Sequence, residues 1–170
     1  ALGLIEEMQN YSLKPNIVCY NTIVDGFCKK GMMNKARDLL VDMMGKGLVP
    51  DDFTFNTMIS GYCKVGRLKE GRCVLQMMKR HNVLPDCFTF NALIDGLRRI
   101  GDFEKASKLK EKMVTLNVFP NVVTYNTLIN GYLDIGEKER ASSLQKEMEI
   151  KGVRPDTVTY SRFIKWFAKE

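Results

Sequence analysis

The residue types that carry out acid–base or nucleophilic chemistry are sparse in this 170-residue chain. His81 is the only histidine, and no C-x-x-C pair occurs among the cysteines, which are Cys19, Cys28, Cys63, Cys73 and Cys87. A catalytic nucleophile needs an adjacent base, and a zinc site needs several histidine or cysteine ligands. We therefore expect no enzyme activity, no bound metal and no cofactor. The cysteines are interpreted as small buried apolar residues in a reducing compartment.

A second kind of chemistry, hydrogen-bond recognition, is indicated by asparagines at a constant spacing. Four of them stand 35 residues apart, at Asn21, Asn56, Asn91 and Asn126. An amide group both donates and accepts hydrogen bonds. It disfavours the interior of a helix, because it competes for backbone hydrogen bonds. From the residues alone two explanations stay open: the amides contact a ligand, or they join neighbouring repeats.

The same interval governs the prolines, glycines and methionines. Every proline falls on it: Pro15, Pro50, Pro85, Pro120 and Pro155. Two glycine columns and one methionine column share it: Gly26, Gly61, Gly96 and Gly131; Gly31, Gly66, Gly101 and Gly136; and Met8, Met43, Met78, Met113 and Met148. The pattern is typical of a repeat array. We divide it into full repeats 17–51, 52–86, 87–121 and 122–156, with partial repeats 1–16 and 157–170. Since it starts and stops inside a repeat, we expect a piece of a longer array.

Each repeat contains two helical patterns separated by a glycine. In repeat 17–51 the apolar faces consist of Val18, Tyr20, Ile23, Val24 and Phe27, and then of Met33, Ala36, Leu39, Leu40 and Met43. Gly31 and Gly47 end the two helices, and Asp51 or Asp52 is placed to cap the next one. Stacked pairs bury apolar faces that a single pair leaves exposed. We predict an all-α solenoid of helix–turn–helix repeats with about ten helices, and close packing at the glycines inside first helices.

Two departures from the lattice concern packing. Gly71 stands where other repeats carry alanine, at Ala1, Ala36, Ala106 and Ala141. It should weaken its helix. Asn82 and Asn117 stand where Gly47 and Gly152 occur elsewhere. Asparagine tolerates the left-handed conformation, so we expect those turns to survive.

Composition favours a folded protein with an anionic partner. Hydrophobic residues make up 45% and charged residues 27% of the chain, and no apolar run approaches the ~18 residues of a membrane span. We therefore expect no membrane association. The net charge is +6, from 26 basic and 20 acidic residues. A positive balance of this size suits a polyanion.

The repeated string V-x-T-Y-N-T-L-I-x-G-Y, here Val122 to Tyr132, and the ending Lys151 to Asp156 resemble the pentatricopeptide repeat family. The resemblance covers the whole chain. It implies a right-handed superhelix that binds single-stranded RNA with one base per repeat. It also implies a plant mitochondrion or chloroplast as the location, and a role in RNA processing, editing, stability or translation.

The resemblance further implies which side chains meet the RNA. The fifth and last residues of each repeat read the base, which gives the pairs Asn21 with Asp51, Asn56 with Asp86, Asn91 with Asn121, and Asn126 with Asp156. Asn16 and Ser161 belong to incomplete pairs. The second position packs against bases, at Val18, Phe53, Phe88, Val123 and Val158. The thirteenth position meets phosphate, at Lys29, Lys64 and Arg99, whereas the fourth repeat has Asp134 there and should attract phosphate less.

Each of these positions also has a structural explanation. Capping of the next helix accounts for the aspartates and Asn121, Phe53 and Phe88 fit a helix core, and a lysine or arginine at a helix C-terminus is favoured without any ligand. The pairing of the capping residues with the asparagines makes base recognition the preferred interpretation.

The chemistry of the pairs indicates a pyrimidine preference. An ionised aspartate only accepts hydrogen bonds, whereas an amide also donates. Uracil offers a ring N–H and cytosine a ring acceptor, so Asn/Asp pairs favour uracil and Asn91 with Asn121 tolerates cytosine. We predict the register 5′-U-U-(C/U)-U-3′, with the N-terminal repeat on the 5′ side. The rival hypothesis is a scaffold that binds proteins on its concave face. Open array ends could also allow self-association.

Overall fold

The computed structural model describes residues 3, 7, 10–11 and 13–168, which contain helices and no strand. It falls into two compact units, Ala1–Pro85 and Asp86–Glu170. The first unit contains α2 (Ile17–Lys29), α3 (Met33–Gly45), α4 (Asp52–Lys64) and α5 (Leu68–Arg80). The second contains α6 (Cys87–Arg99), α7 (Phe103–Thr115), α8 (Val122–Asp134), α9 (Lys138–Ile150) and α10 (Thr157–Phe167). The tenth expected helix falls on residues 1–12, where Ala1 and Met8 lie outside the described residues.

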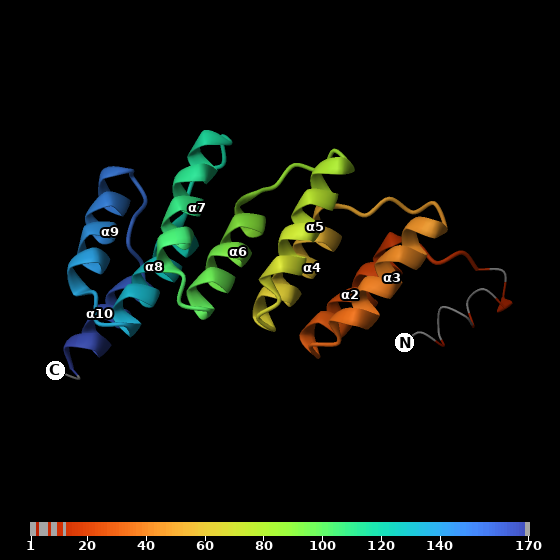
Figure 1. Ribbon diagram of the computed structural model, residues 1–170, viewed down its shortest axis with the longest axis horizontal. Helices are drawn as coiled ribbons and strands as arrows, with labels where there is room; N and C mark the ends of the chain where they lie inside the picture. Colours follow the sequence, from red (N-terminus) through yellow and green to blue (C-terminus); the bar gives the residue numbers. More distant parts are fainter. Residues whose placement is uncertain (1–2, 4–6, 8–9, 12, 169–170) are drawn as a thin grey trace. The chain divides into compact units, whose positions relative to one another are not determined.

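Within each unit the helices form two layers (Figure 1). The first helices of successive repeats pack on one another, α2 on α4 in one unit, and α6 on α8 and α8 on α10 in the other. Each first helix also packs on the second helix of its own repeat, as α4 does on α5 and α8 on α9. The layer of first helices thus brings the same positions of consecutive repeats side by side.

The core between the layers repeats with the lattice. The methionine column is fully buried at Met43, Met78, Met113 and Met148. The alanine column is fully buried at Ala36, Ala106 and Ala141. In α2 the expected apolar face is confirmed for Tyr20 and Val24, which are fully buried, but Val18 is 65% exposed and lies off the core.

The helices begin and end where the local chemistry dictates. Asp51, Asp86, Asn121 and Asp156 cap α4, α6, α8 and α10, each in a reciprocal bond with a threonine three residues later. A cap of this kind stabilises a helix by about 1 kcal/mol. Asn82 and Asn117 both adopt a φ of 58° at the turns that end α5 and α7. The expectation that asparagine replaces glycine there is confirmed.

Two glycines inside first helices allow close helix packing. A Cβ on Gly61 would lie 2.8 Å from the Met33 methyl carbon, and one on Gly131 would lie 2.5 Å from Cε1 of Phe103. Both contacts are shorter than van der Waals distance, so the expected close approach is confirmed at these positions. Gly26 differs, because a Cβ there would meet no described atom within 4 Å. Close packing does not explain that glycine.

Candidate nucleic-acid interface

The first predicted pair, Asn21 and Asp51, meets at the boundary between repeats 17–51 and 52–86. Nδ2 of Asn21 donates to Oδ1 and Oδ2 of Asp51 at 3.1 and 3.3 Å. The carbonyl oxygen of Asn21 accepts from the Thr54 hydroxyl at 2.5 Å. The Asp51 carboxylate in turn accepts from the backbone N–H of Thr54 at 2.8 Å. The three side chains form a closed triad that fixes how the Asn21 amide is oriented.

The same triad recurs in the second unit. Nδ2 of Asn126 donates to Asp156 at 3.0 Å, and Oδ1 of Asn126 accepts from Thr159 at 2.6 Å. The triad of repeat 87–121 has the same form, and its members are Asn91, Asn121 and Thr124. Hydrogen bonds between neighbouring repeats, one of the two explanations left open by the sequence, are thus confirmed for these asparagines.

The remaining predicted pair, Asn56 and Asp86, is divided between the two units. Asn56 is half-buried on α4. Asp86 caps α6, where it accepts from the backbone N–H of Thr89 at 2.9 Å. The incomplete pairs differ again: Asn16 caps α2 by accepting from the backbone N–H of Cys19 at 3.1 Å, and Ser161 is exposed on α10.

The sequence interpretation missed a threonine that each triad requires. This column is buried, at Thr54, Thr89, Thr124 and Thr159. Each threonine is the third residue of its helix, where its hydroxyl bonds back to the cap. The signal was present in the repeated string, because a threonine follows the capping residue by three positions in four repeats.

The two aspartates of the triads, Asp51 and Asp156, are held as carboxylates. Burial acts to raise the pKa of Asp51, but hydrogen bonds from Thr54 and Asn21 outweigh it and lower the pKa. At Asp156 the backbone N–H of Thr159, followed by the Asn126 amide, lowers the pKa. Because an ionised carboxylate only accepts hydrogen bonds, these two side chains present acceptors to any ligand.

Exposure differs among the members of a triad. Asn21 and Asn126 each keep 8% of their surface exposed, whereas Asp156 is exposed and Asp51 half-buried. The capping aspartate is therefore the more accessible member of these two triads.

The second-position side chains are solvent-exposed. Phe53 is 53% and Phe88 is 75% exposed. The core explanation for these two phenylalanines is therefore wrong, because both project away from the helix contacts. Val18, Val123 and Val158 are likewise exposed. This column therefore offers exposed apolar surface on α2, α4, α6, α8 and α10.

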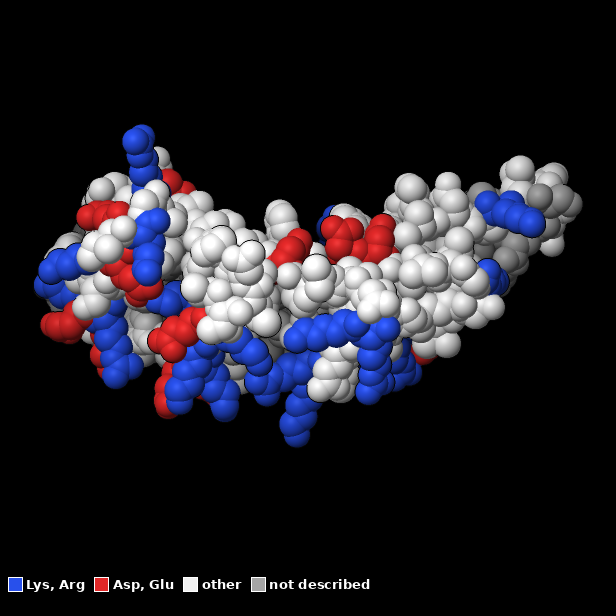
Figure 2. All heavy atoms as spheres, turned by 90° about the horizontal axis from the view of Figure 1, so that it is seen from above, with Lys and Arg blue, Asp and Glu red and all other residues white. Residues whose placement is uncertain are grey.

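The thirteenth-position cations lie in the last turns of α2, α4 and α6. Nζ of Lys29 lies 2.6 Å from Asp25, Nε of Arg99 donates to Asp95 at 2.7 Å, and Lys64 is exposed. Asp134 in the fourth repeat instead accepts from Nη2 of Arg162 at 2.7 Å. Figure 2 shows Lys and Arg side chains exposed at the surface, with Asp and Glu side chains among them.

Other possible sites are limited. The described residues contain no group of three or more His, Cys, Asp or Glu side chains placed to hold a metal ion.

Cys28 and Cys63 are buried as expected, and burial raises the pKa of the Cys28 thiol to about 11. Cys73 is exposed, so the interpretation of every cysteine as a core residue is wrong there. None of the described helices is both long enough and apolar enough to span a bilayer.

The sequence matches a known family of repeat proteins along most of its length. The model of the PPR repeat family matches residues 15–63, 50–99, 88–134 and 120–169. The fold is similar to the pentatricopeptide repeat protein PPR10 in complex with an 18-nt psaJ RNA element, with a TM-score of 0.87 and 26% identity. That match covers 97% of this chain and 24% of the PPR10 chain. PPR10 from maize matches with a TM-score of 0.81, the same identity and the same coverage.

A more distant likeness shows the fold only. The PPR domain of Arabidopsis thaliana protein-only RNase P 1, in complex with tRNA, matches with a TM-score of 0.72 and 17% identity. This match covers 98% of this chain and 88% of that one. No curated protein sequence matches the chain. The predicted all-α repeat solenoid is confirmed, and the chain spans about a quarter of the length of the PPR10 chains that it resembles.

Proposed function

Because this chain belongs to the pentatricopeptide repeat (PPR) family, we propose that it binds single-stranded RNA along its first helices. Each full repeat, 17–51, 52–86, 87–121 and 122–156, takes one base. The PPR10 relative, 26% identical, is described with an RNA element bound. The observation that carries the proposal is the triad of Asn126, Asp156 and Thr159 and its two counterparts, which hold an amide and its partner in a fixed orientation in successive repeats.

The acceptor character of Asp51 and Asp156 favours uracil. Each carboxylate uses one oxygen on the threonine backbone N–H of its capping box. The other oxygen, which at Asp51 also accepts from Nδ2 of Asn21 at 3.3 Å, keeps a lone pair that can accept the ring N–H of uracil. Cytosine has an acceptor nitrogen at that ring position, so two hydrogen-bond acceptors would face each other and no bond would form.

Asn121 presents a donor in the same place. Its Oδ1 accepts from the Thr124 backbone N–H, the Thr124 hydroxyl and the Asn91 amide, at 3.1, 3.2 and 3.2 Å. Because the oxygen is committed, the amide nitrogen is the atom left for a ligand. A donor there accommodates the ring acceptor of cytosine or a carbonyl of uracil. This reasoning supports the register U-U-(C/U)-U.

The exposed second-position residues and the thirteenth-position cations complete the binding surface. Phe53 and Phe88 are proposed to stack on bases, which contributes about 1–3 kcal/mol for each stacked base. Lys29, Lys64 and Arg99 are proposed to contact phosphates. The longer protein would act on organellar RNA, in processing, editing, stability or translation, in a plant mitochondrion or chloroplast.

The proposal is tested by fluorescence anisotropy with labelled oligomers that carry a UUCU or an AAAA core. The UUCU oligomer is expected to bind at least about tenfold more tightly, because each lost hydrogen bond costs about 1 kcal/mol. Asn126→Ala should weaken binding to UUCU. Gln145→Ala, which removes an amide that donates to Glu149 on the second helix α9, should not. Equal affinity for the two oligomers would contradict the proposed pyrimidine register.

A further inference from the structure

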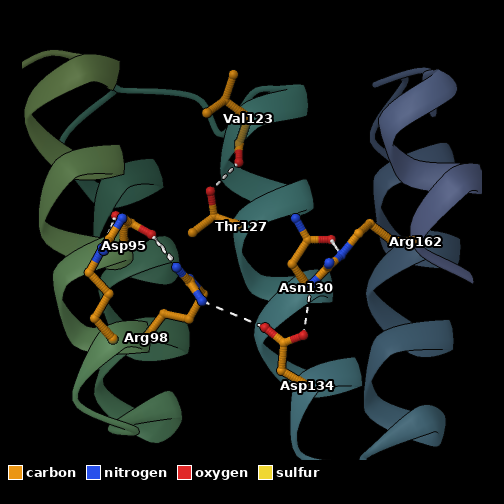
Figure 3. Close-up of polar contacts among 8 residues, drawn as sticks. Asp95, Arg98, Val123, Thr127, Asn130, Asp134 and Arg162 are labelled. Atoms are coloured by element: carbon orange, nitrogen blue, oxygen red, sulfur yellow. Dashed lines mark hydrogen bonds and ion pairs between the residues drawn. The ribbon is translucent and has the colours of Figure 1, made fainter. Parts of the chain in front are cut away.

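One side of α8 carries a row of polar side chains next to the base-reading edge. Thr127, Asn130 and Asp134 lie along this side, and Thr127 donates to the backbone carbonyl of the apolar Val123 one turn earlier (Figure 3). Arg98 reaches it from α6, and Arg162 from α10 (Figure 3). Side chains from three successive first helices of one unit therefore meet on a single surface.

Arg162 is held on this surface by two contacts. Its Nε donates to Oδ1 of Asn130 at 2.8 Å, and its Nη2 donates to Oδ1 of Asp134 at 2.7 Å. A guanidinium carries five N–H donors in a planar fork. The contacts of Arg162 with α8 leave Nη1 available for a further acceptor.

Arg98 approaches the same carboxylate from the opposite side. Its Nη1 lies 3.7 Å from Oδ2 of Asp134, while its Nε and Nη2 donate to Asp95 at 3.0 and 2.8 Å. Arg99 also donates to Asp95. The cluster thus contains three arginines and two aspartates and has a net charge of +1. Asp134 is the anion that joins its two ends.

The two key residues are also the ones that depart from the repeat pattern. Asp134 stands in the column of Lys29, Lys64 and Arg99. Arg162 stands in a column that otherwise holds Thr22, Thr57, Ala92 and Thr127. The cation that the fourth repeat lacks at its thirteenth position is therefore supplied from the sixth position of the next first helix. The ion pair between Asp134 and Arg162 brings the two substitutions together.

We propose that Arg162 and Arg98 form a phosphate-binding site for the RNA backbone, and that Asp134 is its internal competitor. This inference rests on the proposed RNA binding. Phosphate and carboxylate both suit the guanidinium fork, so an RNA phosphate takes the place of the Asp134 carboxylate. The side chains of Arg98 and Arg162 keep 24% and 30% of their surface exposed, which leaves their donors within reach of a strand on this face.

The test measures affinity for the UUCU oligomer over a series of salt concentrations. Arg162→Gln should reduce the slope of log K against log salt by about 0.7, the value for one lost phosphate contact on a single strand. Asp134→Asn should tighten binding by about twofold to fivefold, the range for releasing one partly exposed ion pair. In the double variant, Asp134→Asn with Arg162→Gln, most of this gain in affinity should disappear, because Arg162 is the group that Asp134 holds in an ion pair.

Matched controls separate the site from overall charge. Arg37→Gln and Asp38→Asn make the same charge changes at an exposed pair on the second helix α3. They should leave the slope and the affinity nearly unchanged. The inference is overturned if Asp134→Asn binds no more tightly than the parent, if Asp38→Asn gains as much, or if Arg162→Gln keeps the full slope. In all of these cases a preserved preference for UUCU over AAAA would leave the proposed function standing, whereas loss of that preference in the parent would remove the function itself.

Discussion

The Asn126 amide donates to the Asp156 carboxylate at 3.0 Å, across the boundary between two repeats. Asp156 is at the same time the residue that caps α10. One carboxylate therefore fixes a helix end and orients the amide proposed to read a base. The stability of the array and the reading of the RNA depend on the same hydrogen bonds, so substitutions in a triad should affect both.

The buried threonine of a triad offers the first prediction. Thr124→Val removes the hydroxyl that donates to Oδ1 of Asn91 at 2.7 Å. Because it leaves the half-buried Asn91 acceptor unpaired and removes the Thr124 hydroxyl from its capping box, it should lower the free energy of unfolding by about 1–3 kcal/mol. Urea denaturation measures the loss, and anisotropy should show weaker discrimination at the third base.

Thr127→Val is the matched control on the same helix. The Thr127 hydroxyl donates only to the backbone carbonyl of Val123, at 2.8 Å. Its removal should change the free energy of unfolding by less than about 0.5 kcal/mol. Comparable losses for the two variants would contradict the role assigned to the triad.

Replacing a glycine by alanine should change the stability of the chain in opposite directions in two of the helices. A Cβ on Gly71 would lie 3.5 Å from Sγ of Cys63 and 3.6 Å from Cβ of Tyr62, which are ordinary contacts. Gly71→Ala should therefore stabilise the chain by about 1 kcal/mol through helix propensity. Gly131→Ala should destabilise it by about 1–3 kcal/mol, because the new methyl group meets Phe103 and Arg98 at 2.5 and 2.9 Å. Thermal unfolding followed by circular dichroism distinguishes them, and a stabilising Gly131→Ala would refute the close packing.

Acid should weaken the array through its caps. The pKa of Asp51 is lowered in the folded chain, despite burial, by hydrogen bonds from Thr54 and Asn21. A lowered folded-state pKa gives stability that is complete above the ordinary value of 3.8 and is lost as the pH falls below it. Asp51→Asn should therefore lose less stability than the parent between neutral pH and about pH 3. An acid profile of Asp51→Asn identical to that of the parent would argue against a stabilising Asp51 carboxylate.

Much of the fold could be predicted from the sequence because it repeats. The interval of 35 residues placed the helix pairs, and Asn82 and Asn117 could be assigned to left-handed turns from residue chemistry. Helical periodicity could not decide which side of the first helix faces solvent at its N-terminus. For that reason Val18 was assigned to an apolar face, and Phe53 kept a core explanation that its exposure overturns.

The sequence could predict which residues belong to the site, but not all of the hydrogen bonds and ion pairs that join them. The resemblance to the family paired Asn126 with Asp156, but the role of Thr159 depends on three side chains meeting in space. Asp134 was expected to attract phosphate less because of its charge. The sequence could not show that Arg162, 28 residues away, neutralises that charge, since the contact forms only when α8 and α10 pack.

The most direct test of base recognition changes one atom type in one repeat. Asn121→Asp keeps the helix cap, because both residues cap well, but it replaces the amide nitrogen proposed to meet the base with a carboxylate oxygen. The parent is expected to bind UUCU and UUUU with similar affinity. Asp156→Asn is the converse variant and should make the fourth position tolerate cytosine.

The decisive measurement is the ratio of the dissociation constants for UUCU and UUUU in the parent and in Asn121→Asp. The variant is expected to prefer UUUU by about fivefold or more, the effect of about 1 kcal/mol from one hydrogen bond gained or lost. An unchanged ratio in a variant that folds like the parent would contradict reading of the third base by Asn91 and Asn121.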